Sequence, residues 1–265
     1  MGEAGQDALN GPAAGAPALR RATFADIGAA LAQGWSDFRA FPLFGVFFGG
    51  IFAFGGLFIF VVLKLYGAPW MVIPLAIGFP LLGPFVAVGI YEVSRRRMAG
   101  QPVTWSAVLL RVFDQRERQL GWMAFVVLFI FWIWVYQVRL LLALFLGFRM
   151  PHSLDGFVTV IASTPEGLGF IVVGTLVGAA LSAVLFSTTV FALPMLMERE
   201  IDFVTAMVTS VAAVMKAPLP MLLFGSVIGA ATLSALLPLF LGLVVVLPVM
   251  GHATWRLYAM LSRPG

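Results

Sequence analysis

Cysteine is absent from the chain, and charged residues are scarce. With no cysteine among 265 residues, disulfides, thiolate metal sites, iron–sulfur clusters and cysteine nucleophiles are excluded. Asp, Glu, Lys and Arg make up 11% of the residues, against about 25% in a typical soluble domain. Hydrophobic residues make up 61%, and the mean hydropathy is +1.02. We therefore expect an all-α integral membrane protein, with most side chains facing lipid or neighbouring apolar helices.

Acidic residues are also missing from the middle of every long apolar run. Ionisable groups within the hydrocarbon are costly, and where they occur they mark ion or proton paths. The sequence has no GxSxG, HExxH, CxxCH or P-loop pattern. We therefore expect a protein that is not an enzyme, with no catalytic, cofactor-binding or metal-binding residues and no cofactor. The formal net charge of +4 is attributed to membrane topology and not to nucleic-acid binding.

Six apolar runs reach the roughly 20 residues that a membrane-spanning helix needs. They lie at residues 43–65, 70–93, 122–147, 167–197, 219–236 and 239–258. Arg and Lys gather before the first run, between the second and third, between the fourth and fifth, and after the sixth. The positive-inside rule then places both termini in the cytoplasm. Residues 1–21 are expected to be a disordered cytoplasmic tail, followed by a single membrane domain at 22–262.

Each pair of apolar runs follows a segment with helical amphipathic spacing, at 23–39, 104–119 and 202–216. Thr23, Thr104 and Asp202 are suited to cap these helices. The expected apolar faces are Phe24, Ile27, Leu31, Trp35 and Phe38; Trp105, Val108, Leu109, Val112 and Phe113; and Phe203, Met207, Val211, Val214 and Met215. The chain therefore suggests three repeats of a surface helix and a transmembrane hairpin. We expect these helices to lie in the cytoplasmic membrane interface or to cap the bundle, and docking of a partner protein is the alternative.

Five residues are candidates for structural or ligand contacts: Glu92, Arg95, Arg139, His252 and Arg256. Glu92 can pair with Arg95 or Arg96 one helical turn further on. Arg139 is about 26 Å along a helix from the start of the third run, so it can snorkel to the outer interface or contact an anion or lipid headgroup there. His252 is expected at a helix end or in the bundle, bonded to a carbonyl freed near Pro248.

An aromatic stripe follows the third apolar run, formed by Phe125, Phe129, Trp132 and Tyr136. Trp132 falls near the middle of the bilayer, whereas Trp is usually enriched at the two interfaces. Packing in the bundle or against a partner is the first interpretation, and a quinone or lipid groove is the alternative.

Three segments resemble the signature segments of an uncharacterised family of bacterial integral membrane proteins. They are GFPLLGPFVAVGIYEVSRR (78–96), LPMLMEREIDFVTAMVTSV (193–211) and PVMGHATWRLY (248–258), and the resemblance extends over about residues 23–262. Some members carry the label "cytochrome c oxidase subunit I-like". An oxidase catalytic subunit needs several metal-ligating histidines, whereas His152 and His252 are expected on opposite sides of the membrane. Members often have a second histidine where this chain has Arg256.

The resemblance implies a multi-pass protein of the bacterial inner membrane with about six spans, and it implies no particular activity. We expect a structural or accessory subunit of a membrane complex, respiratory complexes included, with membrane lipids and a complex partner as its contacts. The alternative is a transporter or channel for a neutral or weakly anionic small molecule.

Overall fold

The computed structural model describes residues 13–67, 83–116, 120–147 and 154–262. In the described residues, the regular elements are helices apart from one short pair of parallel strands. The elements are β1 (Ala13–Ala14), α2 (Phe24–Ala40), α3 (Pro42–Leu65), α5 (Gly83–Met98), α6 (Trp105–Arg116), α7 (Leu120–Phe145), α8 (Leu154–Ser163), α9 (Pro165–Thr189), α10 (Ala192–Glu198), β2 (Arg199–Glu200), α11 (Phe203–Lys216), α12 (Pro218–Leu236) and α13 (Leu243–Ser262).

Within the described residues, five helical segments are long and apolar enough to cross a membrane: Pro42–Leu65, Gly121–Phe145, Pro165–Glu198, Pro218–Leu236 and Leu243–Ser262. The expected second span lies partly outside the described residues, and α5 covers its second half. Six spans and a threefold repeat therefore stay predictions. The all-helical membrane architecture is confirmed.

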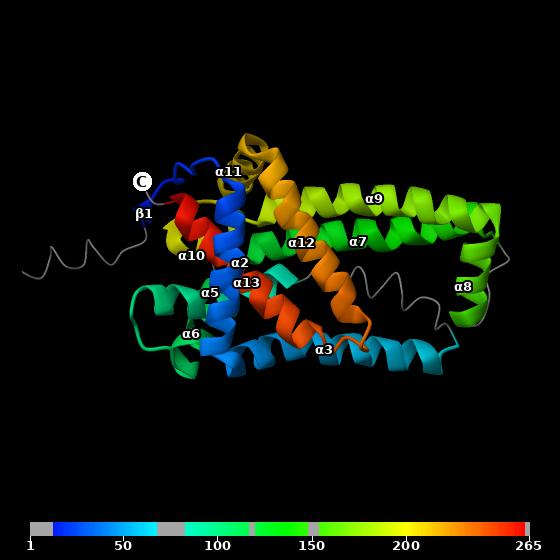
Figure 1. Ribbon diagram of the computed structural model, residues 1–265, viewed down its shortest axis with the longest axis horizontal. Helices are drawn as coiled ribbons and strands as arrows, with labels where there is room; N and C mark the ends of the chain where they lie inside the picture. The colour runs from blue at the N-terminus through cyan, green and yellow to red at the C-terminus, as the bar shows by residue number, and fades with distance from the viewer. Residues whose placement is uncertain (1–12, 68–82, 117–119, 148–153, 263–265) are drawn as a thin grey trace, which may run out of the picture.

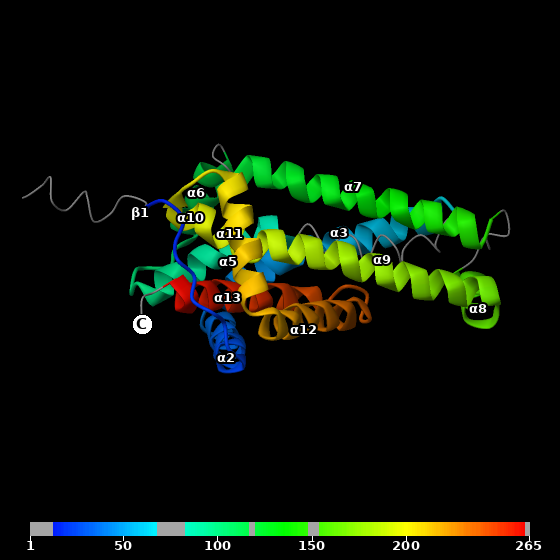
Figure 2. The same ribbon diagram turned by 90° about the horizontal axis from the view of Figure 1, so that it is seen from above.

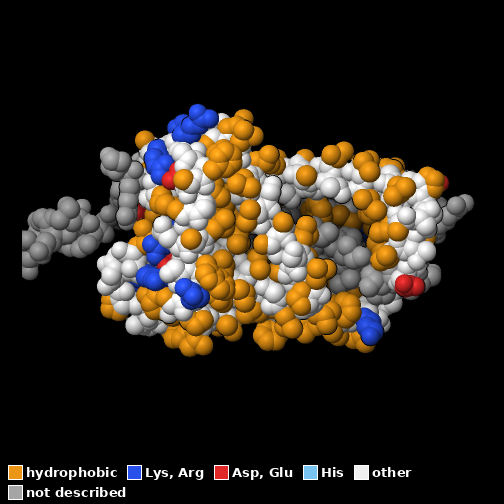
Figure 3. All heavy atoms as spheres, viewed as in Figure 1, with side chains coloured by type: hydrophobic (Ala, Val, Ile, Leu, Met, Phe, Trp, Pro, Cys, Tyr) orange, Lys and Arg blue, Asp and Glu red, His pale blue; other side chains and the backbone are white. Residues whose placement is uncertain are grey.

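The long helices and the short helices run in different directions. In Figures 1 and 2, α3, α7 and α9 lie along the long axis of the molecule, while α2 and α11 cross it at one end and α8 crosses it at the other. We call the end of the molecule where α2 and α11 lie the α2 end. Lys and Arg side chains gather there, and hydrophobic side chains cover most of the remaining visible surface (Figure 3). This is the charge distribution expected of a bundle whose α2 end lies outside the hydrocarbon.

Both ends of the described chain lie at the α2 end. β1 pairs in parallel with β2, and the backbone N–H of Arg20 donates to the carbonyl of Leu261 at 3.0 Å. Leu19 is buried, and its carbonyl accepts from Lys216 Nζ at 3.4 Å. The expected disordered tail over 1–21 is therefore corrected for residues 13–21, because these backbone contacts hold them against the bundle. Residues 1–12 lie outside the described part.

The three expected surface helices correspond to α2, α6 and α11. Thr23 forms a capping box with Asp26, and Asp202 accepts a hydrogen bond from the backbone of Thr205, so two of the three ends are capped firmly. The cap at Thr104 is weaker, since its hydroxyl is 3.4 Å from the nitrogen of Ala107.

Only part of each expected apolar face is buried within the described residues of α2 and α11. Phe24 and Trp35 are exposed, and the buried side of α2 is formed by Ile27, Ala30, Gly34, Asp37 and Phe38. On α11 the buried residues are Ala206, Ser210 and Ala213, whereas Met215 is exposed. Small side chains face the neighbouring helices because they let backbones approach closely, which is how helices associate where lipid is as apolar as the protein.

Two irregular segments shape the bundle. The expected single span 167–197 is divided into α9 and α10, and buried Ser210 of α11 occupies the break, donating to the carbonyl of Ser187 at 2.7 Å and accepting from the nitrogen of Phe191 at 3.1 Å. The turn between α12 and α13 places Leu239 and Phe240 at positive φ, 51° and 68°. This conformation is unfavourable for bulky residues. In this turn the Phe240 ring packs directly over Gly56 of α3, where any Cβ would lie 2.5 Å from the ring.

Candidate functional site

A buried polar cluster joins α2, α5 and α13 at the α2 end. Its centre is Asp37, which is fully buried. Arg256 donates to both carboxylate oxygens, at 2.7 and 2.6 Å, and Arg97 donates to one of them at 2.5 Å. Ser94 donates to the carboxylate at 2.7 Å, and the Ser94 oxygen also lies 2.7 Å from Nδ1 of His252. We call these five residues the Asp37 cluster.

Close packing of α2 on α13 positions this cluster. A Cβ placed on Gly34 would lie 2.7 Å from the backbone nitrogen of Ala253 and 2.8 Å from the carbonyl of Val249. Only glycine allows this approach, which brings Asp37, one turn further along α2, onto the face of α13 that carries Arg256.

The charge of Asp37 is balanced by its neighbours. Burial alone would raise the pKa of this carboxyl group, but the hydrogen bonds from Arg256 and Ser94 and the nearby positive charges outweigh burial. The pKa of Asp37 therefore lies below its ordinary value. Two guanidinium groups share one carboxylate, so the cluster carries one excess positive charge when His252 is neutral.

The contacts of Ser94 determine the tautomer of His252. An ionised carboxylate accepts hydrogen bonds only, so the single proton of the Ser94 hydroxyl is donated to Asp37. The oxygen must then accept from His252, which places the imidazole proton on Nδ1. Nε2 is left with a lone pair, and it is buried without a hydrogen-bond partner among the described residues. The expected bond from His252 to a carbonyl freed near Pro248 is wrong, because Nδ1 is bonded to Ser94.

The order of groups in the cluster determines what chemistry it can support. In a nucleophilic triad the histidine lies between the acid and the serine, and it removes the serine proton. Here Ser94 lies between Asp37 and His252, and its proton points to the acid. The serine is therefore not activated, and the geometry is that of an ionic clamp between three helices.

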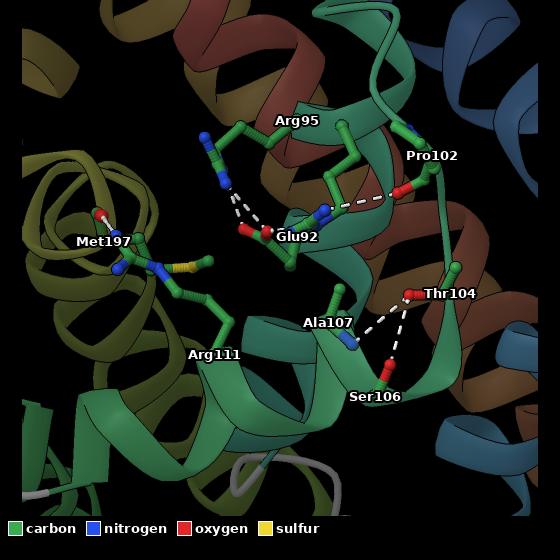
Figure 4. A network of polar contacts seen from close by, with 9 residues as sticks. Glu92, Arg95, Pro102, Thr104, Ser106, Ala107, Arg111 and Met197 are labelled. Atoms are coloured by element: carbon green, nitrogen blue, oxygen red, sulfur yellow. Dashed lines mark hydrogen bonds and ion pairs between the residues drawn. The ribbon is translucent and has the colours of Figure 1, made fainter. Parts of the chain in front are cut away.

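A second polar cluster lies at the C-terminal end of α5 (Figure 4). Glu92 is fully buried and accepts two hydrogen bonds from Arg95 and one from Arg96, each at 2.7 Å, as the helical spacing indicated. Arg96 also donates to the carbonyl of Pro102 at 3.2 Å, which holds the loop between α5 and α6. Arg111 of α6 donates to the carbonyl of Met197 at 2.7 Å and so ties α6 to the end of α10.

Arg139 and the aromatic stripe lie apart from these clusters. Arg139 is exposed on α7. The stripe is exposed too, at 65% for Phe125, 57% for Phe129, 56% for Trp132 and 62% for Tyr136. Among the described residues the stripe is not packed inside the bundle, since α7 buries its other side, which includes Met123, Val127 and Trp134. A partner protein, or a quinone or lipid, is then what the stripe contacts.

A cavity of about 290 Å³ lies between α3, α5, α9, α12 and α13. Its wall is mainly apolar, with Phe48, Phe52, Leu185, Ile228 and Leu247 among the residues that form it. Two buried threonines on the wall donate to carbonyls of their own helices: Thr189 to Leu185 at 2.6 Å and Thr254 to Met250 at 2.8 Å. Tyr91, Ser182 and Thr232 add further hydroxyl groups, and no charged side chain is among the described residues that form the wall.

Sequence reasoning found His252, Arg256, Glu92 and Arg95 but missed Asp37. Asp37 does not belong to the apolar face expected for its helix, so its position there gave no sign of burial. A usable signal was the spacing of Ala30, Gly34 and Asp37 at i, i+4 and i+7. This spacing puts a carboxylate at the end of a small-residue stripe.

Within the described residues no group of three or more His, Asp or Glu side chains is arranged to hold a metal ion. Long apolar helices, with charges collected in buried clusters at one end, define the class as a multi-pass helical membrane protein. Residues 72–198 match the family described as "Predicted integral membrane protein (DUF2189)", which confirms the resemblance to an uncharacterised family of integral membrane proteins. No curated protein and no solved structure matches the chain.

Proposed function

We propose that this protein is a non-catalytic structural or accessory subunit of a complex in the bacterial inner membrane, with respiratory complexes the first to examine. The observation that supports the proposal is the exposed aromatic stripe of α7. Its rings associate in pairs, with centroids 6.5 Å apart for Phe125 and Phe129 and 5.8 Å apart for Trp132 and Tyr136. Aromatic residues are enriched in protein–protein interfaces.

The depth of the stripe supports a protein partner over lipid. Trp132 is the thirteenth residue of α7, which begins at Leu120, so it lies roughly 18 Å along the helix. Aromatic residues that face lipid are concentrated at the two membrane surfaces. A tryptophan exposed halfway along a spanning helix is better explained by a contact with another helix.

The polar clusters support a non-catalytic role. The carboxylates of Asp37 and Glu92 are fully buried and each is bonded to two arginines, so neither is available as a general base in its present state. We further propose that the α2 end faces the cytoplasm, with both termini there, because the positive-inside rule assigns the Arg- and Lys-rich end to that side.

Site-specific photocrosslinking in intact cells tests the proposed interface. The photoreactive residue p-benzoylphenylalanine replaces Trp132 or Phe129, and the matched control carries it at Phe54 of α3, which is 74% exposed. We expect the two α7 positions to give the same discrete protein adduct, identified by mass spectrometry, and the control to lack it. Adducts with a second copy of this chain alone, or equal labelling at all three positions, would contradict the proposal.

The alternative, a transporter or channel for a neutral or weakly anionic small molecule, receives some support from the cavity. Flux of candidate solutes into proteoliposomes tests it. The apolar wall is better suited to a hydrophobic molecule than to a polar solute, so we hold the accessory role as the first proposal.

A further inference from the structure

The cavity opens toward the side of the bundle, between α9 and α12. The two helices meet through the rings of Phe186 and Phe224, whose centroids are 6.3 Å apart, and α12 then runs away from α9 at a steep angle (Figure 1). Beyond that contact the cavity is bordered by exposed residues of both helices: Ser182, Gly229 and Leu233. Figure 3 shows hydrophobic side chains on this face beside α12.

α9 and α12 both belong to candidate membrane spans, so this opening faces the hydrocarbon of the bilayer and not water. The molecules present there at high concentration are phospholipid acyl chains. Water fits this space less well than an acyl chain does, since the wall is mainly apolar and its two buried threonines already donate within their own helices.

The size and shape of the cavity also fit an acyl chain. The cavity of about 290 Å³ is roughly twice the volume of the ~150 Å³ apolar cavity that admits benzene. A glycine stands at its border: a Cβ placed on Gly229 would meet no atom within 4 Å, so space is open where a side chain would otherwise project. A flexible acyl chain that enters from the side would pack against the apolar wall and would need no fixed polar contact.

We propose that this cavity is a binding site for one acyl chain of a phospholipid from the surrounding bilayer. The inference goes beyond the accessory role and is independent of any protein partner. Gly229→Leu should fill the site without a backbone clash, because the added side chain enters open space. Losing contact with two methylene groups should weaken binding of the acyl chain about tenfold.

The experiment uses the full-length protein in liposomes that contain a phospholipid with a diazirine on one acyl chain. After illumination, labelled peptides are mapped by mass spectrometry. We expect strong labelling of residues 182–193 and 225–233 in the wild type, and a loss of about tenfold in Gly229→Leu. The matched control is Gly174→Leu on α9, which lies outside the cavity and whose Cβ would make only an ordinary 3.9 Å contact with Leu141. Its labelling should stay at the wild-type level.

Labelling of the exposed face of α7 by bulk lipid serves as the internal reference. The proposal is overturned if cavity peptides are labelled no more than this face, if Gly229→Leu leaves their labelling unchanged, or if a free diazirine fatty acid labels them while the phospholipid does not. Should Gly229→Leu fail to give a monodisperse protein, Thr232→Leu on the same wall replaces it, with the same expected loss.

Discussion

Replacing Asp37 by Asn should destabilise the protein substantially, because it removes the only negative charge of the Asp37 cluster and leaves Arg97 and Arg256 without a counter-ion. Breaking a buried ion pair by removing one partner costs roughly 3–5 kcal/mol. The guanidinium of Arg97 is 33% exposed and that of Arg256 is 15% exposed, so water can solvate part of the unpaired charge. We therefore expect a loss near the lower bound, about 3 kcal/mol.

Thermal unfolding of detergent-solubilised protein, followed by tryptophan fluorescence, measures this loss. At roughly 2–4 °C per kcal/mol for a chain of this size, the midpoint should fall by about 6–12 °C. The matched control is Asp26→Asn, which breaks the partly exposed ion pair with Arg20 and half of a capping box, and should cost about 1 kcal/mol.

A double variant separates charge from packing. Replacing both Asp37 and Arg256 by leucine removes the pair together, and buried pairs exchanged for apolar residues often lose little stability. Its loss should therefore be smaller than the sum of the losses of the two single variants. The reasoning is refuted if Asp37→Asn is no less stable than Asp26→Asn, or if the double variant loses the full sum.

Two further predictions concern the same contact. The pKa of Asp37 is lower in the folded protein than the ~3.9 of an unfolded chain, so its contribution to stability is fully present above about pH 4 and is lost as the pH falls through the folded pKa. Unfolding midpoints measured between pH 7 and pH 3 should therefore fall more steeply for wild type than for Asp37→Asn. Parallel curves for the two proteins would contradict this prediction. Gly34→Leu should cost about 1–3 kcal/mol in the same unfolding assay, because its Cβ would meet the backbone of Ala253 and Val249, whereas Gly28→Ala, with nothing within 4 Å, should leave the midpoint nearly unchanged.

Local spacing in the sequence was enough for much of the helical framework. The caps at Thr23 and Asp202 and the pairing of Glu92 with Arg95 depend on residues three or four positions apart, where the sequence alone is informative. The contacts between residues far apart in the sequence could not be predicted from such spacing. Asp37 lies 57 residues from Ser94 and 219 residues from Arg256, and nothing in the pattern of α2 alone shows that these groups meet.

The spacing of apolar residues did not show which side of α2 is buried. An amphipathic face can pack against the bundle, or it can contact the membrane interface or a partner, and the spacing is the same in each case. On α2, Phe24 and Trp35 are exposed while Gly34 and Ala30 are buried. Hydrophobicity therefore located the helices of this protein but not their buried sides.

The contact between α2 and α13 combines the two devices that hold helices together where the hydrophobic effect is weak. Gly34 allows close backbone approach, and the Asp37 cluster supplies hydrogen bonds from partly buried arginines to a fully buried carboxylate. Neither feature would be sufficient alone. Close packing without hydrogen bonds would not fix the position of α2 along α13, and the carboxylate of Asp37 without close packing would meet water or remain unpaired. Because α2 and α13 stand at opposite ends of the described chain, their contact closes the bundle. Variants of Gly34 and Asp37 should therefore be strongly non-additive, the second adding little once the first has separated the two helices.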